Sequence, residues 1–280
     1  MRVEEAILVH IAPGLKRIRE RFWAADDLAL VSYPLAAQAR IAAIEDSSFW
    51  FRHRNRVIGA VVGRHPPEEL ILDVGGGNGA VSLALKHCGI SAIVLEPGIS
   101  GSSIAHARGL TVIQSTFDGA MFVAGSVPAI GLFDVIEHIV DDVQLLRDCR
   151  TAMRSGGLLY VTVPALQSLW SSDDGFAGHH RRYNRRSLRA ALLASGFEIV
   201  TLSAFFSLLV PLTFLFRTLP SALGSRRVED VEKAFNHHSP GQRVGALMER
   251  LLGLEHAMIA RGYALPFGTS LIAVARKSAS

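Results

Sequence analysis

Acidic residues and glycines lie close together in the first half of the chain, in an order that suits ligand binding. Asp73 lies near the end of an apolar run that continues into four glycines, and Glu96 ends the next apolar run. Glycine allows a tight turn from a strand into a helix, and its missing side chain lets a ligand lie against the backbone. A carboxylate at the tip of the neighbouring strand can accept both hydroxyls of a ribose. The pattern therefore predicts a pocket for an adenosine-containing cofactor.

Two kinds of cofactor fit this glycine pattern. Gly75-x-Gly77-x-x-Ala80 satisfies the dinucleotide-binding pattern of nicotinamide and flavin enzymes. The same segment reads Asp-x-Gly-x-Gly-x-Gly from Asp73 to Gly79, which resembles the first motif of class I S-adenosylmethionine-dependent methyltransferases. A dinucleotide places its pyrophosphate on the helix N-terminus, where a nearby anion is unfavourable. The Asp73 carboxylate better suits the cationic amino-acid end of S-adenosylmethionine.

Apolar segments alternate with helical patterns along the chain, which indicates parallel strands joined by right-handed crossovers. We expect an α/β fold with a doubly wound, mostly parallel seven-stranded sheet. Ligands of such sheets bind beyond the carboxyl ends of the strands, where Asp73, Glu96 and Asp134 lie in this interpretation. The expected strands are residues 70–75, 91–96, 110–114, 128–133, 157–163, 196–202 and 270–276, with helices after Gly79, Ser100, Ile139 and Arg185.

The chain outside this alternation is expected to be mostly helical. An N-terminal helical lid is predicted, with helices over Ile7–Trp23 and Tyr33–Ile44 and a further helical segment around Ser48–Arg56. A helical insertion before the last strand, with a helix over Val244–Ile259, is expected to cover the substrate. The predicted boundaries are 1–60 for the lid, 61–203 for the cofactor-binding α/β core, 204–265 for the insertion and 266–280 for the closing strand of the core sheet.

Composition and charge narrow the possible classes of protein. The chain has 280 residues, of which 49% are apolar and 19% charged, and its formal net charge is +4. This supplies a core for one large domain or for a domain with an appendage. No basic segment is interleaved with aromatic residues, so no nucleic-acid partner is expected. Cys88 and Cys149 lie far apart and the N-terminus has no long apolar segment, so we expect a reducing, cytoplasmic location.

The segment 205–219 is unusually apolar and contains Pro211. It is shorter than the roughly 20 residues that a helix needs to span a bilayer, so a transmembrane helix is not expected. Three roles stay open for it, namely the wall of a substrate pocket, a homodimer face, or a peripheral contact with a membrane or lipid.

With these residues in view, the chain resembles class I S-adenosylmethionine-dependent methyltransferases of the group that acts on small molecules such as quinones, sugars and lipids. The resemblance covers residues 45–278 and implies a Rossmann-like methyltransferase fold with S-adenosylmethionine as the cofactor. Besides the glycine motif, it rests on Glu96, on the run Asp134-Val-Ile-Glu137-His138, on the run His179–Leu188 followed by Gly196-Phe197, and on the closing segment Pro266–Arg276.

The resemblance also implies which residues contact the cofactor. Asp73 and the glycines hold the methionine moiety, and Glu96 holds the ribose. The family often has an acid at the end of the third strand for the adenine amino group, but here Val112–Phe117 has none and Asp118 is slightly displaced. No Asn/Asp-Pro-Pro-Tyr motif is present, which counts against methylation of nucleic-acid bases. The implied cofactor contacts are Asp73, Gly75, Gly77, Asn78, Gly79, Glu96, Pro97, Thr116, Phe133 and Asp134.

Methyl transfer from a sulfonium is an in-line displacement, so positioning in a dry pocket supplies much of the catalysis. A general base is needed only when the acceptor arrives protonated, and histidine suits that role at neutral pH. The candidate catalytic residues are His138, which by resemblance faces the methyl-transfer site, and His179 and His180, which follow the fifth strand. His138 has a structural alternative, which is to fix its loop by a backbone hydrogen bond.

Candidate substrate residues lie in two places. Arg182 and Tyr183 could hold a phosphate or carboxylate, or they could belong to a capping segment whose charges face water. Trp50 and Arg54 could close over the sulfonium or the acceptor, or they could pack a helix against the sheet. The sequence has no obvious set of three carboxylates for a divalent cation, so no metal is expected.

These observations predict an S-adenosylmethionine-dependent methyltransferase whose methyl acceptor is a small molecule, amphiphilic or linked to a lipid or sugar. Two other classes stay open. An NAD-dependent oxidoreductase would use the same glycine turn and Glu96. A non-catalytic interaction protein could keep the cofactor-binding fold and use residues 205–220 as its interaction face.

Overall fold

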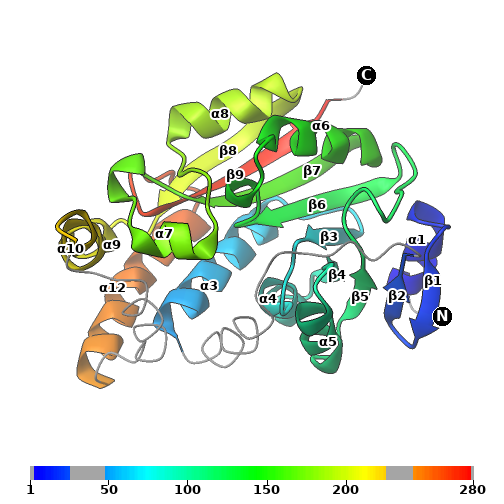
Figure 1. The fold of residues 1–280 in the computed structure, drawn as a ribbon, viewed down its shortest axis with the longest axis horizontal. Helices are drawn as coiled ribbons and strands as arrows, with labels where there is room; N and C mark the ends of the chain where they lie inside the picture. Colours follow the sequence, from blue (N-terminus) through cyan, green and yellow to red (C-terminus); the bar gives the residue numbers. More distant parts are fainter. Residues whose placement is uncertain (1–2, 26–47, 225–241, 279–280) are drawn as a thin grey trace.

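The computed structural model describes residues 3–25, 48–224 and 242–278. Its centre is one nine-stranded sheet with the order β1-β2-β5-β4-β3-β6-β7-β9-β8 (Figure 1). The strands from β2 to β7 pair in parallel, whereas β1 and β9 are antiparallel to their neighbours. The strands are β1 (Lys16–Arg19), β2 (Phe22–Ala24), β3 (Leu70–Val74), β4 (Ser91–Leu95), β5 (Thr111–Gln114), β6 (Val127–Phe133), β7 (Met153–Pro164), β8 (Phe197–Phe205) and β9 (Ser270–Lys277).

Helices cover both faces of this sheet (Figure 1). α1, α6 and α8 pack on one face, and α3, α4 and α12 pack on the other. The helices are α1 (Val3–Ile11), α3 (Phe49–Arg64), α4 (Ala80–His87), α5 (Ile99–Ala107), α6 (Asp142–Ala152), α7 (Ser172–Ala177), α8 (Arg185–Ala194), α9 (Leu209–Thr213), α10 (Leu219–Ala222) and α12 (Gln242–Ala260), with the short helical segments η1 (Ile136–His138), η2 (Gln167–Leu169) and η3 (Phe214–Thr218).

The central strands are apolar along their whole length because helices cover both of their faces. Every residue of β3 and of β6 is buried. Successive side chains of a strand point to opposite faces, so Leu70 and Leu72 join the core with α1, α6 and α8, whereas Ile71 joins the core with α3, α4 and α12. Parallel pairing then places the carboxyl ends of β3, β4 and β6 side by side at one edge of the sheet.

The α/β fold with a mostly parallel sheet is confirmed, and the seven predicted strands correspond to β3 through β9. The sheet has nine strands rather than seven because a hairpin, β1 and β2, precedes them. The helix predicted over Ile7–Trp23 is therefore wrong in its second half. β2 pairs in parallel with β5, with Phe22 opposite Val112. Pairing with the sheet edge overrides the local helical pattern of this segment.

The helical segment predicted around Ser48–Arg56 is confirmed as α3. Its N-terminus is capped by the Ser48 hydroxyl, which accepts a hydrogen bond of 3.3 Å from the Trp50 backbone N–H. The helix predicted over Tyr33–Ile44 lies outside the described residues. Between β8 and β9 the described residues form α9, η3, α10 and α12, and α12 contains the predicted helix Val244–Ile259. Within the described ranges, no helix has the length and apolar character needed to cross a membrane.

Candidate active site

The turn between β3 and α4 adopts a backbone conformation that requires glycine. Gly75, Gly77 and Gly79 have φ angles of 68°, 54° and 74°, in the left-handed region that other residues rarely adopt. A Cβ atom on Gly79 would lie 2.4 Å from Leu110 Cδ1, whereas a Cβ atom on Gly77 would have no neighbour within 4 Å. Gly79 is thus required for packing, and Gly77 borders open space in which a ligand can lie.

Glu96, which directly follows β4, is hydrogen-bonded to this turn. The Glu96 carboxylate is buried, and it accepts hydrogen bonds from the Gly77 N–H at 3.0 Å and from the Gly98 N–H at 2.7 Å. These bonds hold the carboxylate beside the open space at Gly77, in the position expected of a ribose-binding acid. The predicted contacts Asn78 and Pro97 are buried and half-buried, respectively.

Asp73 lies near the carboxyl end of β3 and is almost completely buried. The Ser82 hydroxyl donates a hydrogen bond of 2.6 Å to Asp73 Oδ2. Burial raises the pKa of Asp73 to about 6, although the hydrogen bond from Ser82 and the charge of Arg54 oppose the rise. The carboxylate is thus ionised at neutral pH while largely removed from water, so a cationic ligand group would stabilise it.

β4 and β3, which carry Glu96 and Asp73 at their ends, lie between β5 and β6 in the sheet. Thr116 lies just after β5, and Phe133 is the last residue of β6. The Thr116 hydroxyl accepts a 3.0 Å hydrogen bond from the Gly119 N–H, and Phe133 is buried. Next to Thr116, the buried Ser115 hydroxyl has no hydrogen-bond partner within the described part of the chain. Ser115 was not among the predicted site residues, and its unpaired hydroxyl makes it a further candidate for cofactor binding.

Asp134 follows β6 and pairs with Arg54 of α3. Arg54 Nε donates to Asp134 Oδ2 at 2.5 Å, and Arg54 Nη2 donates to the Phe133 carbonyl at 3.2 Å. The Thr162 hydroxyl donates to Asp134 Oδ1 at 3.1 Å. On the same helix, Trp50 stacks on Phe206 with a centroid distance of 5.2 Å. Of the two predicted lid residues, Arg54 therefore reaches the site directly. Trp50 instead packs against Phe206, which directly follows β8.

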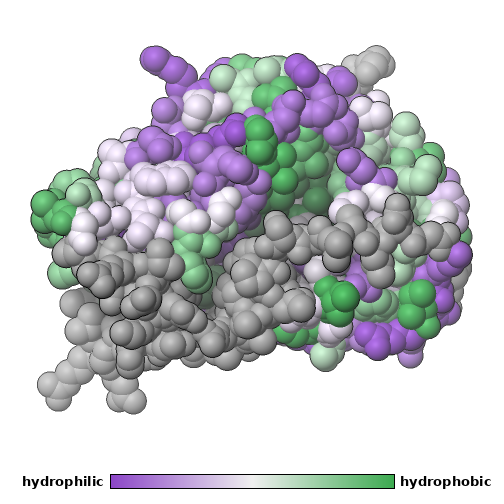
Figure 2. All heavy atoms as spheres, in the orientation of Figure 1, coloured by the Kyte–Doolittle hydropathy of each residue, from purple (hydrophilic) through white to green (hydrophobic). Residues whose placement is uncertain are grey.

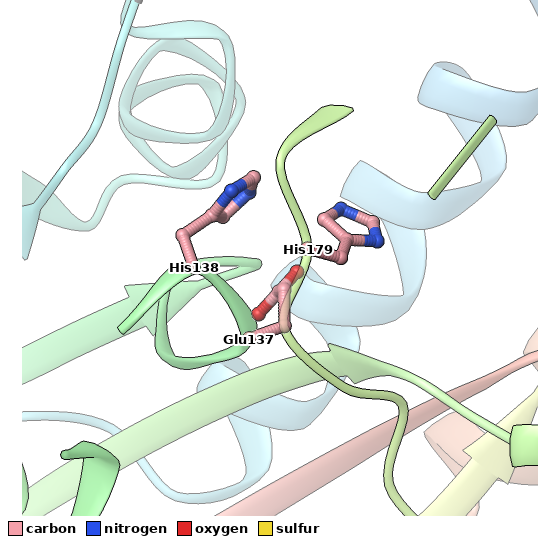
Figure 3. A group of neighbouring side chains, drawn as sticks. All are labelled: Glu137, His138 and His179. Atoms are coloured by element: carbon pink, nitrogen blue, oxygen red, sulfur yellow. The ribbon is translucent and has the colours of Figure 1, made fainter. Parts of the chain in front are cut away.

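Glu137, His138 and His179 form a second cluster next to Asp134. Their potential ligand atoms all lie within 4.8 Å of one another, and Figure 3 shows the Glu137 carboxylate next to the two rings, whose centroids lie 4.8 Å apart. Glu137 is completely buried, and neither carboxylate oxygen has a hydrogen-bond partner among the described residues. Burial and the charge of Asp134 raise the pKa of Glu137 well above its ordinary range. Burial and His179 lower the pKa of His138 to about 4, so its imidazole is neutral at physiological pH.

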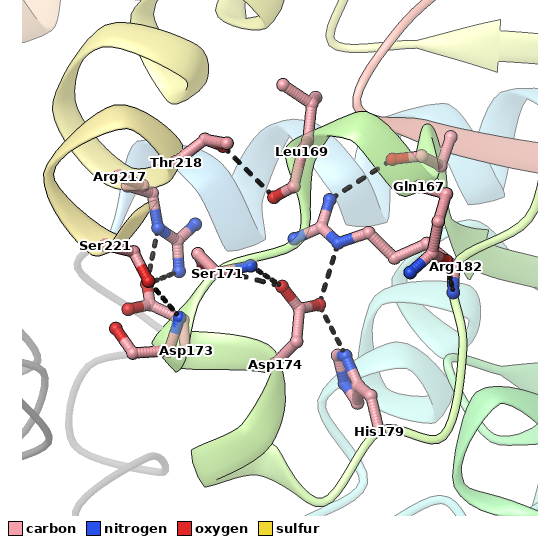
Figure 4. Close-up of polar contacts among 12 residues, drawn as sticks. Gln167, Leu169, Ser171, Asp173, Asp174, His179, Arg182, Arg217, Thr218 and Ser221 are labelled. Carbon is pink, nitrogen blue, oxygen red and sulfur yellow. Dashed lines mark hydrogen bonds and ion pairs between the residues drawn. The ribbon is translucent and has the colours of Figure 1, made fainter. Parts of the chain in front are cut away.

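Asp174 of α7 fixes one ring of this cluster (Figure 4). Asp174 Oδ1 lies 2.9 Å from His179 Nδ1 and accepts a 2.7 Å hydrogen bond from Arg182 Nε. Asp174 Oδ2 accepts from the Ser171 N–H as part of a capping box. Although burial alone would raise it, the hydrogen bonds from His179 and Arg182 lower the pKa of Asp174 to about 2. The predicted substrate residue Arg182 is thus held in an internal ion pair, with its side chain only 7% exposed.

The structure brings His138 and His179 together but leaves two of the neighbouring candidates elsewhere. His180 is exposed, and its backbone N–H donates to the Glu137 carbonyl at 2.8 Å. Tyr183 is buried, and its hydroxyl donates to Asp142 Oδ2 at 2.5 Å, at the start of α6. Tyr183 therefore links the loop after β7 to α6. Within the described structure its role is to hold these two segments together.

Within the second cluster and its immediate contacts, Glu137 and Asp174 were not among the predicted site residues. Glu137 stands in the motif used for the resemblance, but no local pattern indicates that its carboxylate is buried. Asp174 does carry a local signal, since Ser171-x-x-Asp174 fits the capping-box pattern of a helix N-terminus. Its contact with His179 depends on the path of the chain after α7.

The site combines a glycine turn, an acid at the end of the next strand and an acid after the fourth strand of the core, all at one edge of the sheet. This is the arrangement expected of a methyltransferase cofactor site. Residues 44–202, more than half of the chain, match the family model described as "Methyltransferase domain". The chain belongs to this family of methyltransferase domains. The predicted recognition is confirmed.

Three comparisons place the chain within this class. A Mycobacterium tuberculosis protein named as a probable S-adenosylmethionine-dependent methyltransferase is 25% identical over 178 residues, which are 61% of this chain and 64% of that protein. A ubiquinone biosynthesis O-methyltransferase from Xanthomonas campestris is 30% identical over 103 residues, 34% of this chain and 43% of that one. A SAM-dependent methyltransferase from Thermotoga maritima has a similar fold, with a TM-score of 0.54 at 16% identity over 88% of this chain and 100% of that chain.

The chain spans less than two thirds of the length of these two sequence relatives. The Mycobacterium tuberculosis relative and the Thermotoga maritima structure are both named as S-adenosylmethionine-dependent, so the prediction of this cofactor is confirmed. The nicotinamide alternative, which used the same glycine turn, has no support from these comparisons.

Proposed function

We propose that this protein transfers a methyl group from S-adenosylmethionine to a small-molecule acceptor. The observation that carries the proposal is the position of Glu96, whose carboxylate is hydrogen-bonded to Gly77 beside the open space that Gly77 borders. A ligand that lies against Gly77 would meet the Glu96 carboxylate with its ribose hydroxyls. The backbone around Gly75 and Gly79 would hold the remainder of the cofactor.

The charged groups at this sheet edge suit the two ends of the cofactor. The buried Asp73 carboxylate would bind the ammonium group of the methionine moiety, because an opposite charge offsets its burial. Asp134, held by Arg54, would line the methyl-transfer site at the end of β6. The neutral His138 imidazole has a lone pair with which it can accept a proton from an acceptor hydroxyl. Catalysis then depends mainly on positioning and on the exclusion of water.

We further propose an amphiphilic acceptor, on the evidence of an apolar patch on the described part of the insertion. Figure 2 shows hydrophobic atoms gathered over α9 and α10, at one side of the face seen in Figure 1. A water-facing surface of this composition is typical of a contact with lipid or protein. The patch consists of Leu208, Leu212, Phe214, Leu215, Phe216, Leu219 and Leu223, each between 36% and 73% exposed.

The apolar patch is connected to the candidate site through α7. Arg217 of η3 forms an ion pair with Asp173, and the Ser221 hydroxyl accepts a 2.9 Å hydrogen bond from the Ser172 N–H (Figure 4). The next residue, Asp174, holds His179 from the same short helix. An acceptor with a polar headgroup and an apolar tail could therefore place the headgroup at His179 and its tail along the patch.

Isothermal titration with S-adenosylhomocysteine and with NAD tests the cofactor. We expect micromolar binding of S-adenosylhomocysteine, no binding of NAD, and at least a tenfold loss of S-adenosylhomocysteine affinity in Glu96→Gln. Glu69→Gln, which changes an acid at an exposed surface position, is the matched control and should bind as the wild type does. Binding of NAD in place of S-adenosylhomocysteine would make the protein an oxidoreductase, and binding of neither would favour an interaction protein.

Labelled S-adenosylmethionine tests the nature of the acceptor. The protein is incubated with S-adenosylmethionine that carries a radioactive methyl group and with a cell extract divided into organic-soluble and aqueous fractions. Label in the organic-soluble fraction would support an amphiphilic acceptor, and label only in the aqueous fraction would contradict it. Vesicle flotation and light scattering of Leu215→Ser, with Val140→Ser as a control at another exposed apolar position, separate a lipid contact of the patch from a homodimer face.

A further inference from the structure

Glu137 is a buried acid for which the described structure supplies no partner. It is completely buried, and both of its carboxylate oxygens lack a hydrogen bond among the residues that the structure describes. Buried carboxylates are normally paired or bound to a metal because burial of an unpaired charge is costly. The carboxylate lies next to both His138 and His179 (Figure 3), so two imidazoles border the space into which it points.

The nearby arginines, Arg54 and Arg182, form their ion pairs with other acids. Arg54 pairs with Asp134 at 2.5 Å, and Arg182 pairs with Asp174 at 2.7 Å. Each guanidinium therefore has its own carboxylate. Glu137 is left as the acid of this group without an ion-pair partner among the described residues, and a bound cation would stabilise its ionised form.

One histidine is already oriented as a ligand. Asp174 Oδ1 lies 2.9 Å from His179 Nδ1, and Asp174 is held in place by Arg182 and Ser171. An acid acceptor at Nδ1 fixes the proton there and leaves the Nε2 lone pair available. A carboxylate–histidine pair of this kind is the usual outer contact of a metal-binding imidazole.

We propose that Glu137, His138 and His179 bind a divalent first-row transition-metal ion. Two imidazole nitrogens and one carboxylate oxygen form the facial set that suits Fe²⁺, Mn²⁺, Co²⁺ or Zn²⁺ better than Mg²⁺ or Ca²⁺. With ligand distances of about 2.0–2.2 Å and the angles of a facial or tetrahedral set, any two ligand atoms lie about 2.8–3.6 Å apart. The present ligand atoms lie within 4.8 Å of one another, so side-chain rotations that bring them closer complete the site. This proposal departs from the expectation, drawn from the sequence, that no metal is bound.

Three protein ligands leave coordination positions open for another oxygen. If the protein is the methyltransferase proposed above, a hydroxyl oxygen of the acceptor takes one of these positions. His138, as a metal ligand, then no longer serves as the base described above. Coordination instead lowers the pKa of that hydroxyl, and its proton passes to solvent. The oxygen–methyl bond then forms as the sulfonium–methyl bond breaks, and the cofactor leaves as a neutral thioether. The acceptor class that this site selects is accordingly one whose reacting atom is a hydroxyl oxygen.

Metal binding by tag-free, chelator-treated protein tests the site without any methyl acceptor. Mn²⁺ is titrated while free Mn²⁺ is followed by electron paramagnetic resonance, and Co²⁺ is titrated while its visible absorption is followed. We expect one ion per chain with a dissociation constant in the micromolar range or below. Glu137→Gln and His138→Gln should each weaken binding at least tenfold, and Asp174→Asn should weaken it by about tenfold through His179.

His180→Ala is the matched control, because His180 is the next residue after His179 and its side chain is exposed. It should bind the ion as the wild type does. Titration of S-adenosylhomocysteine into every variant shows whether the fold is intact and whether the cofactor site works. A wild-type protein that binds S-adenosylhomocysteine but no Mn²⁺ or Co²⁺ up to 1 mM would overturn the metal site alone. If Glu137→Gln bound the metal as tightly as the wild type, the ion would lie elsewhere, and the proposed site would also be overturned.

Discussion

Arg54 Nε of α3 lies 2.5 Å from Asp134 Oδ2, although 80 residues separate the two in the sequence. Asp134 has a φ angle of 58°, in the left-handed region that costs a non-glycine residue about 1 kcal/mol or more. The ion pair and the hydrogen bond from Thr162 hold the carboxylate in this conformation. The helix before the first core strand is thereby joined to the end of β6, in the centre of the candidate site.

Loss of the Arg54–Asp134 pair should reduce both stability and cofactor binding. In Arg54→Gln, Asp134 would stay partly buried next to the acid Glu137 without its counter-charge. We expect the free energy of unfolding to fall by about 2 kcal/mol and the affinity for S-adenosylhomocysteine to fall several-fold. Urea denaturation measures the first effect and calorimetry the second. The exposed Arg56 on the same helix provides the control, and Arg56→Gln should change stability by less than about 0.5 kcal/mol.

The glycine turn allows binding and packing to be separated by two similar substitutions. Gly77→Ala adds a Cβ atom to open space, so it should cost about 1 kcal/mol of stability for its positive φ and should greatly weaken S-adenosylhomocysteine binding. Gly79→Ala places its Cβ atom 2.4 Å from Leu110 Cδ1, so it should lower the melting temperature more. Thermal unfolding and calorimetry of both variants check this order. Equal binding by Gly77→Ala and the wild type would show that the cofactor does not lie against this residue.

Asp73 should make cofactor binding and stability respond to pH in opposite directions. Burial raises its folded-state pKa from 3.8 to about 6, so the unfolded chain loses the proton first as the pH rises. Stability therefore falls between about pH 4 and pH 6, and above that range the ionised Asp73 destabilises the fold by up to about 3 kcal/mol. Binding of a cationic ligand group needs the ionised form, so S-adenosylhomocysteine affinity should decrease as the pH falls below 6.

Asp73→Asn tests both halves of that prediction. The variant should melt at a higher temperature than the wild type at pH 7.5, with a smaller difference at pH 4. Its affinity for S-adenosylhomocysteine should be at least tenfold lower at pH 7.5 and nearly independent of pH between 5 and 8. A wild-type affinity that stays constant from pH 7.5 to pH 5 would contradict a role for this carboxylate in binding the ammonium group.

Tyr183→Phe should distinguish a structural residue from a substrate contact. The hydroxyl of Tyr183 donates to Asp142 Oδ2 at 2.5 Å in a buried position. Its removal leaves a buried carboxylate oxygen without this donor and should cost about 1–3 kcal/mol. We expect a lower melting temperature and an S-adenosylhomocysteine affinity within twofold of the wild type. If Tyr183→Phe were as stable as the wild type but used the methyl acceptor differently, Tyr183 would be a substrate contact, as predicted from the sequence.

The core sheet was predictable because its strands are continuous apolar runs that end in glycines or acids. β3 and β6 are buried along their whole length, and such runs are typical of parallel strands between two layers of helices. The hairpin β1–β2 was not predictable in the same way. All four residues of β1, Lys16–Arg19, are exposed, so the segment has the composition of the solvent face of a helix.

Some residues of the candidate site could likewise be predicted from the sequence, and others could not. Gly75, Gly77 and Glu96 follow from a local motif, because one short stretch of chain contains both the turn and the strand ends. His138 directly follows Glu137, but His179 comes from a segment about 40 residues further along, and only the folded chain brings it to the carboxylate. A ligand from a separate segment has no fixed spacing in the sequence from the other two.

The position of the β1–β2 hairpin has a consequence for solubility. Without it, β5 would form the edge of the sheet, and all four residues of β5, Thr111–Gln114, are buried in the present fold. An apolar strand with unpaired backbone groups is a template for pairing with a second molecule. β1 instead presents Lys16, Arg17 and Arg19 at that edge, and like charges repel a second copy. A fragment that begins at α3 should therefore self-associate through β5, so residues 3–25 protect the protein against aggregation.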